Sequence, residues 1–229
     1  MKNLFRFFVK LFFWAVLFSV GLVVLFKFVP VLVSPLMVIR YFEDPSEKQL
    51  WKHDWISIAE MPKNIQIAVI CSEDQKFTQH NGFDIEAIEK AYEYNKKGKR
   101  LKGASTISQQ TAKNVFLWPS RSWLRKGLET YFTFLIEKIW SKERILEVYL
   151  NSIEMGNGVY GVEAAANYWF NKSAKKLTVY EAAAIASVLP NPRKYRANPA
   201  SAYIQKRKQW VVDQMQFYGP LNFKKTNDN

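Results

Sequence analysis

The segment AVICSEDQKFTQHNGFD, residues 68–84, ends an apolar run in two adjacent acids, Glu73 and Asp74. Adjacent helical residues point about 100° apart, so the two carboxylates cannot serve one reacting atom. Helical spacing places Glu73 on an apolar stripe with Ile65, Val69 and Phe77. Apolar surroundings disfavour the charged form and raise the pKa of a carboxyl group toward values that suit a general base or acid. The alternative is a partly exposed acid paired with Lys76 or His80.

A second stretch, GASTISQQTAKN from Gly103 to Asn114, combines many neutral hydrogen-bonding side chains with one cation. Gly103 and Ser105 are typical of a loop that enters a helix N-terminus, where free N–H groups and the helix dipole attract anions. Its serine, threonine and glutamine side chains suit sugar hydroxyls and phosphate oxygens. The alternative is a polar, capped helix with no ligand.

A third stretch, RSWLRKGLE from Arg121 to Glu129, carries three cations within six residues and then an acid. One interpretation is an ion pair between Arg125 and Glu129 on a helix, which contributes only a few tenths of a kcal/mol. The other is a cationic lining for phosphates, with Glu129 free to hold a divalent metal.

Two further patterns match known motifs but lack their context. Gly156–Gly161 reads G-x-G-x-x-G, but the segment before it is helical, whereas a dinucleotide site requires a strand there. We expect a tight turn before a helix over 162–170. Ser173–Lys176 reads S-x-x-K without the S-D-N and K-T-G patterns of a transpeptidase.

The elements that must position these residues are mostly helices. Apolar spacing predicts helices over 64–77, 125–140 and 143–150, and Thr178 with Glu181 forms a capping box before another. Alternating strand patterns are lacking, so we predict a mainly α fold. The four prolines between residues 30 and 62 indicate a connector.

The N-terminus carries an uninterrupted apolar run over residues 11–26, preceded by Lys2, Arg6 and Lys10. Flanking apolar residues lengthen it toward the ~20 residues that span a bilayer, and the preceding cations place the N-terminus in the cytoplasm. A cleaved signal peptide is the alternative, but no small-x-small cleavage site follows the run. A buried core helix would show an apolar stripe instead of being apolar all round.

Composition narrows the class of protein. Lys and Arg number 33 against 20 Asp and Glu, a formal charge of +13 that suggests an anionic partner. The single cysteine, Cys71, rules out an intrachain disulfide framework. Because the chain has only two histidines, we expect no His-rich metal site.

Together these stretches resemble the peptidoglycan glycosyltransferases of glycosyltransferase family 51, in particular their monofunctional, single-pass members. The matching motifs are E-D-x-x-F-x-x-H-x-G (73–82), G-x-S-T-I-x-Q-Q-x-x-K-N (103–114), R-K-x-x-E (125–129), N-x-I-x-x-G-x-G-x-Y-G (151–161) and the E-A-A block from Glu181. They cover about residues 60 to 200 in the family's order. Thr130 departs from it, where the family often has an aliphatic residue.

The resemblance implies a mainly α, lysozyme-like glycosyltransferase domain with head and jaw lobes and one N-terminal transmembrane helix. It divides the chain into a cytoplasmic tip and anchor (1–33), a connector (34–62) and a peptidoglycan glycosyltransferase domain (63–229). The activity implied is polymerisation of lipid II into glycan strands with inversion and release of undecaprenyl diphosphate.

The resemblance also implies roles for residues. Glu73 is the general base and Glu129 a second catalytic acid that holds a divalent cation, Mg or Mn. The residues implied to bind substrate are Asp74, Phe77, Gly103, Ser105, Thr106, Gln109, Gln110, Lys113, Asn114, Arg121, Arg125 and Lys126. A diphosphate leaving group develops negative charge and needs cations, not a second acid to protonate it.

The expected partners are lipid II, the growing glycan chain and membrane lipids, with transpeptidases and the cell-wall synthesis machinery as further partners and no nucleic acid. The expected location is the cytoplasmic (inner) membrane, with the catalytic domain in the periplasm. Two alternatives stay open: a lysozyme-like hydrolase or lytic transglycosylase that uses Glu73 as an acid, and an inactive membrane-anchored scaffold.

Overall fold

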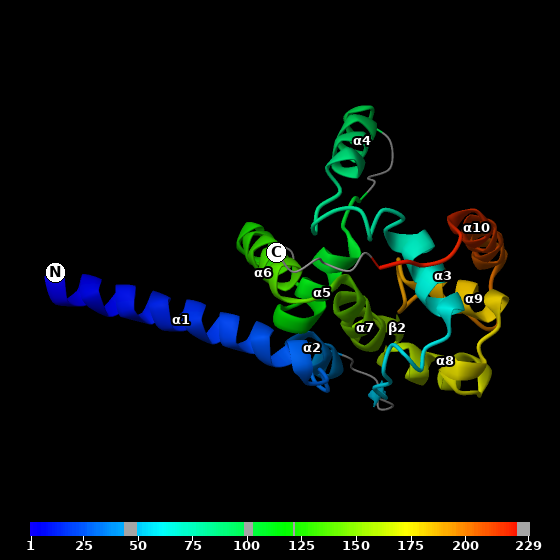
Figure 1. Cartoon of the computed structure of the whole chain (residues 1–229), viewed down its shortest axis with the longest axis horizontal. Helices are drawn as coiled ribbons and strands as arrows, with labels where there is room; N and C mark the ends of the chain where they lie inside the picture. Colours follow the sequence, from blue (N-terminus) through cyan, green and yellow to red (C-terminus); the bar gives the residue numbers. More distant parts are fainter. Residues whose placement is uncertain (44–49, 99–102, 121, 224–229) are drawn as a thin grey trace.

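The protein is mainly helical, as predicted. The computed structural model describes residues 1–43, 50–98, 103–120 and 122–223. Its helices are α1 (Lys2–Phe28), α2 (Pro35–Glu43), α3 (Lys63–Glu73), α4 (Ile85–Lys96), α5 (Ile107–Phe116), α6 (Trp123–Ile139), α7 (Lys142–Ser152), α8 (Val162–Phe170), the 3₁₀ turn η1 (Ala174–Lys176), α9 (Val179–Val188) and α10 (Ala202–Tyr218). Figure 1 shows α1 and α4 projecting from a body in which α5–α7 lie beside the group of α3 and α8–α10.

The helix α1 is long and apolar enough to cross a membrane, the single such helix among the described residues. It fits the predicted single-pass anchor. Its last third is tied to the domain: Ser19 Oγ lies 2.8 Å from Tyr131 Oη on α6, and Trp140 Nε1 donates to the carbonyl of Val23. The guanidinium of Arg144 on α7 donates to the carbonyl of Phe26 at 2.8 Å, where the helix leaves its own carbonyls unpaired.

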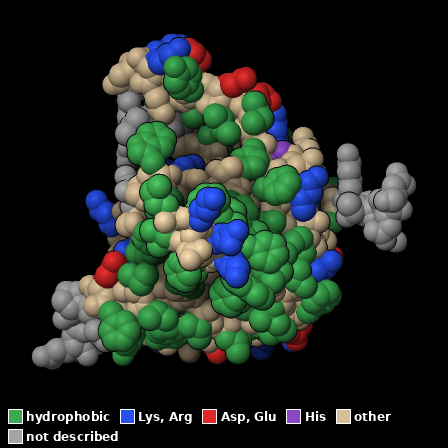
Figure 2. All heavy atoms as spheres, turned by 90° about the vertical axis from the view of Figure 1, so that its left-hand side faces the viewer, with side chains coloured by type: hydrophobic (Ala, Val, Ile, Leu, Met, Phe, Trp, Pro, Cys, Tyr) green, Lys and Arg blue, Asp and Glu red, His purple; other side chains and the backbone are tan. Residues whose placement is uncertain are grey.

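Hydrophobic side chains gather on the face of the molecule from which α1 projects, as Figure 2 shows. At the N-terminus of α6, which packs against α1, Trp123 is 93% exposed and Leu124 71% exposed. Isolated exposed apolar residues are ordinary, but a clustered apolar face marks a surface with a partner. This apolar face lies beside the helix that is long and apolar enough to cross a membrane.

The segment predicted as a connector is packed into the domain. Helix α2 contacts α5, and strand β1 (Lys52–His53) pairs in parallel with β3 (Val159–Tyr160). Strand β2 (Glu154–Gly156) pairs antiparallel with β3 and completes a three-stranded sheet in the order β1-β3-β2. Two- and three-residue strands are too short to show alternation, which is why the sequence pattern gives no sign of them.

The core joins two groups of helices. In one, α9 packs against α3 and α10, and its alanines, among them Ala182, Ala183 and Ala186, are fully buried and allow close helix approach. In the other, α5 packs against α6 and α7. Helix α8 has the predicted bounds, and the predicted capping box of Thr178 and Glu181 begins α9. Both groups contribute to the site described below.

One helix ends earlier than predicted. Helix α3 stops at Glu73, whereas the sequence pattern continued it to residue 77. Asp74 leaves the helical conformation, with φ −162° and ψ 77°, because its side chain accepts a hydrogen bond from the backbone N–H of Ile107 at the start of α5. Glu73 therefore stands at the C-terminal end of α3, where the chain turns toward α5.

Candidate active site

Glu73 is held by neutral hydrogen-bond donors. Its Oε2 accepts from Gln110 Nε2 on α5 at 3.0 Å, and its Oε1 accepts from Ser72 Oγ at 3.2 Å. Burial raises the pKa of Glu73 above its ordinary value, and these two donors and the nearby Arg207 guanidinium oppose that rise. The raised pKa predicted from the apolar stripe is confirmed in direction. A carboxylate in this setting is suited to take up a proton.

Asp74 points elsewhere, as predicted, but the reason is that it has left the helical conformation and not the angle between helical neighbours. It is 7% exposed, and its Oδ1 lies 2.9 Å from His80 Nε2, so the pairing with His80 that was the alternative interpretation forms at Asp74 and not at Glu73. Together with its bond to Ile107 N–H, this fixes the end of α3 against the start of α5. Asp74 lines the site but its oxygens are already engaged.

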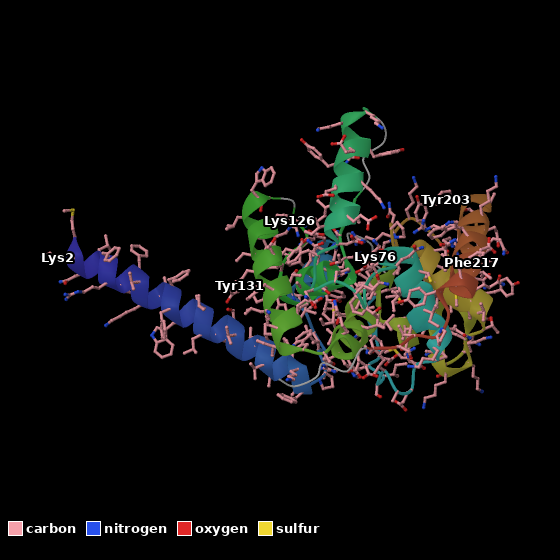
Figure 3. The ribbon with its side chains drawn as sticks, turned by 45° about the horizontal axis from the view of Figure 1, so that its top comes forward. Lys2, Lys76, Lys126, Tyr131, Tyr203 and Phe217 are labelled. Atoms are coloured by element: carbon pink, nitrogen blue, oxygen red, sulfur yellow. The ribbon has the colours of Figure 1, made fainter. Side chains whose placement is uncertain are left out.

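The loop before α5 forms one wall of a cavity of about 320 Å³ at Glu73. Its lining includes Glu73, Asp74, Asp84, Gly103, Ser105 and Trp210. Ser105 is exposed there, as a substrate-binding side chain should be. Figure 3 shows Lys76, another lining residue, on the segment after α3, whereas the labelled Lys126 belongs to α6.

Three of the predicted substrate-binding side chains have structural roles. Thr106 and Gln109 are buried and form a capping box at α5, with the Thr106 N–H donating to Gln109 Oε1 at 3.0 Å. Thr106 Oγ1 also donates to the carbonyl of Gly82 at 2.6 Å. Gly82 has φ +89°, and a Cβ there would lie 2.9 Å from a Thr133 methyl, so the position requires glycine. Phe77 is fully buried, and its ring is a core contact.

A second cavity, of about 400 Å³, lies on the other side of Gln110. Its lining includes four cations and one carboxylate: Arg40, Lys113, Arg125, Arg193 and Glu154. Asn114 also lines it, with its Nδ2 donating to the carbonyl of Gln110. Gln110 lines this cavity and also donates to Glu73, so one side chain links the acid to the wall of the cationic cavity.

Among the cations of this cavity, Lys113 is the one without a partner in the described residues. It is partly buried and makes no hydrogen bond or ion pair within the described part of the chain. Burial lowers the pKa of Lys113 below its ordinary value, and neighbouring Arg125 and Arg40 act in the same direction while Glu129 opposes them. Burial also raises the pKa of Glu154, so the ionised form of the one carboxyl group that lines this cavity is disfavoured. An anion bound here would favour the charged form of Lys113 and offset the repulsion among the neighbouring cations.

Glu129 forms the predicted ion pair, and a further one. Its Oε2 lies 2.7 Å from Arg125 Nη1, its Oε1 lies 2.5 Å from Lys126 Nζ, and it is 3% exposed. Both oxygens are thus occupied, and the described residues contain no group of three or more His, Cys, Asp or Glu side chains that could hold a metal ion. This donor set does not fit a resident divalent cation.

Sequence reasoning missed three arginines. Arg40 on α2 lines the cationic cavity, and its buried Nε has no hydrogen-bond partner among the residues that the structure describes. Arg193 lines the same cavity, and Arg207 on α10 donates to Ser72 Oγ at 3.1 Å. Each lies outside the three stretches considered, and Arg193 lies between α9 and α10, so helical periodicity in those stretches could not have identified them. Arg121, predicted to bind substrate, lies outside the described residues.

Comparison with known proteins adds an independent observation. A family profile described as "Transglycosylase" matches residues 42–216. A protein of Bacteroides thetaiotaomicron named "Biosynthetic peptidoglycan transglycosylase" is 55% identical over 192 residues, which cover 83% of this chain and 77% of the relative. A protein of the same name from Bdellovibrio bacteriovorus is 55% identical over 86% of this chain and 80% of the relative. Another, from Shewanella oneidensis, is 46% identical over 99% of this chain and 97% of the relative.

Proposed function

The chain belongs to the transglycosylase family, and from this premise we propose how it polymerises peptidoglycan glycan strands. The substrates are lipid II and the growing glycan chain. Each cycle forms one glycosidic bond and releases the lipid diphosphate on which the growing chain was carried. The chain's own residues divide this work between the two cavities.

Glu73 acts as the general base. One carboxylate oxygen takes the proton from the 4-hydroxyl of the acceptor sugar. The electron pair of that hydroxyl oxygen then attacks C1 of the growing chain. The C1–O bond to undecaprenyl diphosphate breaks as the new bond forms, and the anomeric centre inverts. The observation that carries this assignment is that Gln110 both donates to Glu73 and lines the cationic cavity.

The cationic cavity accepts the leaving diphosphate. Lys113 has no protein partner among the described residues, and Arg40, Arg125 and Arg193 surround the same space. Cations placed where negative charge develops lower the barrier directly, because they need no reorganisation during the reaction. Glu129 positions Arg125 and Lys126 through its two ion pairs.

The arrangement favours transfer over hydrolysis. A hydrolase needs one carboxyl group to protonate the leaving glycosidic oxygen and a second to act as base or nucleophile. Asp74, the carboxylate next to Glu73, has both oxygens engaged by His80 and Ile107 N–H. A diphosphate needs no such acid, and this site supplies cations instead.

A divalent cation remains a prediction, from the family resemblance. The described residues do not favour it, because Glu129 is a single carboxylate with both oxygens paired. Chelation of Mg and Mn during polymerisation is the test. Activity that survives chelation would agree with the cationic side chains, and activity restored by either metal would restore the prediction.

We further propose that α1 anchors the protein in the cytoplasmic membrane with its N-terminus inside and the domain in the periplasm. Lys2, Arg6 and Lys10 precede the apolar run, which is the orientation signal of short cytoplasmic segments. This location brings the site to a lipid-linked substrate. Protease added to intact spheroplasts should degrade the domain, and a protected domain would reverse the orientation.

The central experiment uses fluorescent lipid II in detergent with the full chain. We expect polymeric products and released lipid diphosphate, and we expect Glu73→Gln to lower turnover by about 10³-fold because it removes the base. Preformed glycan strands should not shorten. Near-normal polymerisation by Glu73→Gln, or strand cleavage in place of polymerisation, would contradict the proposal.

A further inference from the structure

Behind Gln110 lies a buried tyrosine that the mechanism has not used. Tyr149 on α7 is 1% exposed, and its hydroxyl donates to Gln110 Oε1 at 3.1 Å. The other end of the same amide, Gln110 Nε2, donates to Glu73 Oε2 at 3.0 Å. The three side chains form a line from the core of the protein to the acid, and they come from α7, α5 and α3.

The direction of the Gln110 amide decides which form of Glu73 it stabilises. An amide has a donor end and an acceptor end, and the donor end favours a carboxylate whereas the acceptor end favours a protonated acid. The Tyr149 hydroxyl makes no other hydrogen bond within the described residues. A reversed amide would leave its buried O–H without an acceptor, which is unfavourable. Tyr149 therefore selects the orientation in which NH₂ faces Glu73.

We propose that Tyr149 is a positioning residue that fixes the Gln110 amide and thereby holds Glu73 in the ionised form that a general base requires. The inference rests on the proposed function of Glu73, and it assigns to α7 a part in proton transfer. Tyr149 acts through Gln110 and does not touch the reacting sugar.

Other groups also face Glu73, and they are unchanged when the tyrosine hydroxyl is removed. On its own segment these are Asp74, bonded to His80, and Ser72. Helix α10 contributes Arg207, which donates to Ser72 Oγ, and α9 contributes the carbonyl of Ala186, which accepts from Ser72. Lys76 and Asp84 line the cavity at Glu73. A difference between the parent protein and Tyr149→Phe thus reports the amide orientation.

The test is the pH profile of kcat/KM for lipid II in Tyr149→Phe. Without the hydroxyl, the amide can reverse and accept a hydrogen bond from protonated Glu73, so the pKa of Glu73 rises. The acidic limb of the profile should move up by about one pH unit, and activity should approach that of the parent protein above the limb. A lower rate at all pH values with an unmoved limb would overturn the proposal.

The matched control is Tyr160→Phe, which removes a hydroxyl from another tyrosine that is 1% exposed. It should leave the limb in place, and an equal shift in this variant would count against Tyr149. If Tyr149→Phe does not fold, Tyr149→Met, whose unbranched side chain adapts to irregular space, replaces it with the same expected shift.

A second measurement is independent of turnover. The infrared carboxyl band that disappears in Glu73→Gln can be titrated without substrate, and its midpoint should be higher in Tyr149→Phe than in the parent. An unchanged midpoint overturns the role of Tyr149 even if Glu73 proves to be the base. A shifted midpoint together with normal polymerisation by Glu73→Gln would instead refute the proposed function of Glu73 and leave the amide orientation established.

Discussion

Glu73 and Glu129 are both withdrawn from solvent and both belong to the site, but their partners differ in kind. Glu73 receives hydrogen bonds from the neutral donors Gln110 and Ser72. Glu129 receives them from two cations, Arg125 and Lys126. Burial raises the pKa of Glu73, because neutral donors compensate only part of the cost of removing a carboxylate from water.

The difference separates two tasks that a transferase must perform. A base must change its charge during the reaction, so it needs surroundings in which the neutral and ionised forms are close in free energy. A residue that positions cations needs short, charge-assisted hydrogen bonds that fix both of its oxygens. The same residue type therefore performs opposite tasks, and the same substitution at each position should have opposite effects on stability.

Glu129→Gln should give the largest effect on stability. It leaves Arg125 without its buried partner, so we expect the free energy of unfolding to fall by roughly 3 kcal/mol, toward the low end for a broken buried pair because Lys126 is 43% exposed. Polymerisation should fall by about 10²–10³-fold as the cations lose their positions. Thermal unfolding and lipid II turnover measure the two effects.

Glu143→Gln is the control for the loss of one negative charge, because Glu143 is exposed at the start of α7. It should change both quantities little. A Glu129→Gln protein as stable and active as this control would remove the contrast between the two acids.

Lys113→Met should lower kcat/KM by about 10²-fold, the usual effect of removing one group that stabilises developing charge. Lys113 faces the cationic cavity and has no partner in the described residues, so the change should weaken binding of the lipid-diphosphate donor and spare binding of a glycan without diphosphate. Fluorescence binding to each ligand checks this. Lys176→Met, an exposed lysine on η1, is the control, and equal losses for both ligands would contradict the assignment.

Local sequence predicted those features of the site that local geometry decides. The bounds of α8 and the capping box at Thr178 follow from short-range patterns. The Arg125–Glu129 pair follows from i,i+4 spacing. These predictions need no knowledge of what packs against the helix.

Contacts between distant segments decided the rest. Helix α3 ends early because Asp74 bonds to Ile107 N–H, 33 positions away, and Tyr149 reaches Gln110 across 39 positions. Arg40 meets Lys113 because α2 packs on α5. From the sequence, a side chain such as Thr106 could bind substrate. The structure shows instead that Thr106 is hydrogen-bonded in the capping box of α5.

Arg40→Gln should have a smaller effect than Lys113→Met. Arg40 lines the cationic cavity from α2, but its side chain is 29% exposed and already contacts Glu43, so we expect KM for the donor to rise about fivefold with little change in kcat. Steady-state kinetics with lipid II measure this. Arg196→Gln, an exposed arginine that lines neither cavity, is the control. If the donor KM is unchanged in Arg40→Gln, then Arg40 does not take part in binding the donor.

The smallest expected effect tests the contrast most directly, because it concerns the stability of Glu73→Gln. The folded-state pKa of Glu73 lies above its unfolded value, so ionisation is easier in the unfolded chain. As pH rises from the unfolded pKa through the raised folded pKa, the parent protein loses stability, and above that window the loss is complete. Glutamine is neutral at every pH and avoids this loss.

Glu73→Gln should therefore be more stable than the parent at pH 8 and should unfold at a higher Tm. The difference should vanish near pH 4, where the parent acid is protonated in both states. Scanning calorimetry at the two pH values measures it. Glu129→Gln should be less stable than the parent at pH 8, so the two substitutions should change stability in opposite directions. A Glu73→Gln protein that is also less stable at pH 8 would contradict this contrast. It would mean that the neutral donors stabilise the Glu73 carboxylate as strongly as the cations stabilise that of Glu129.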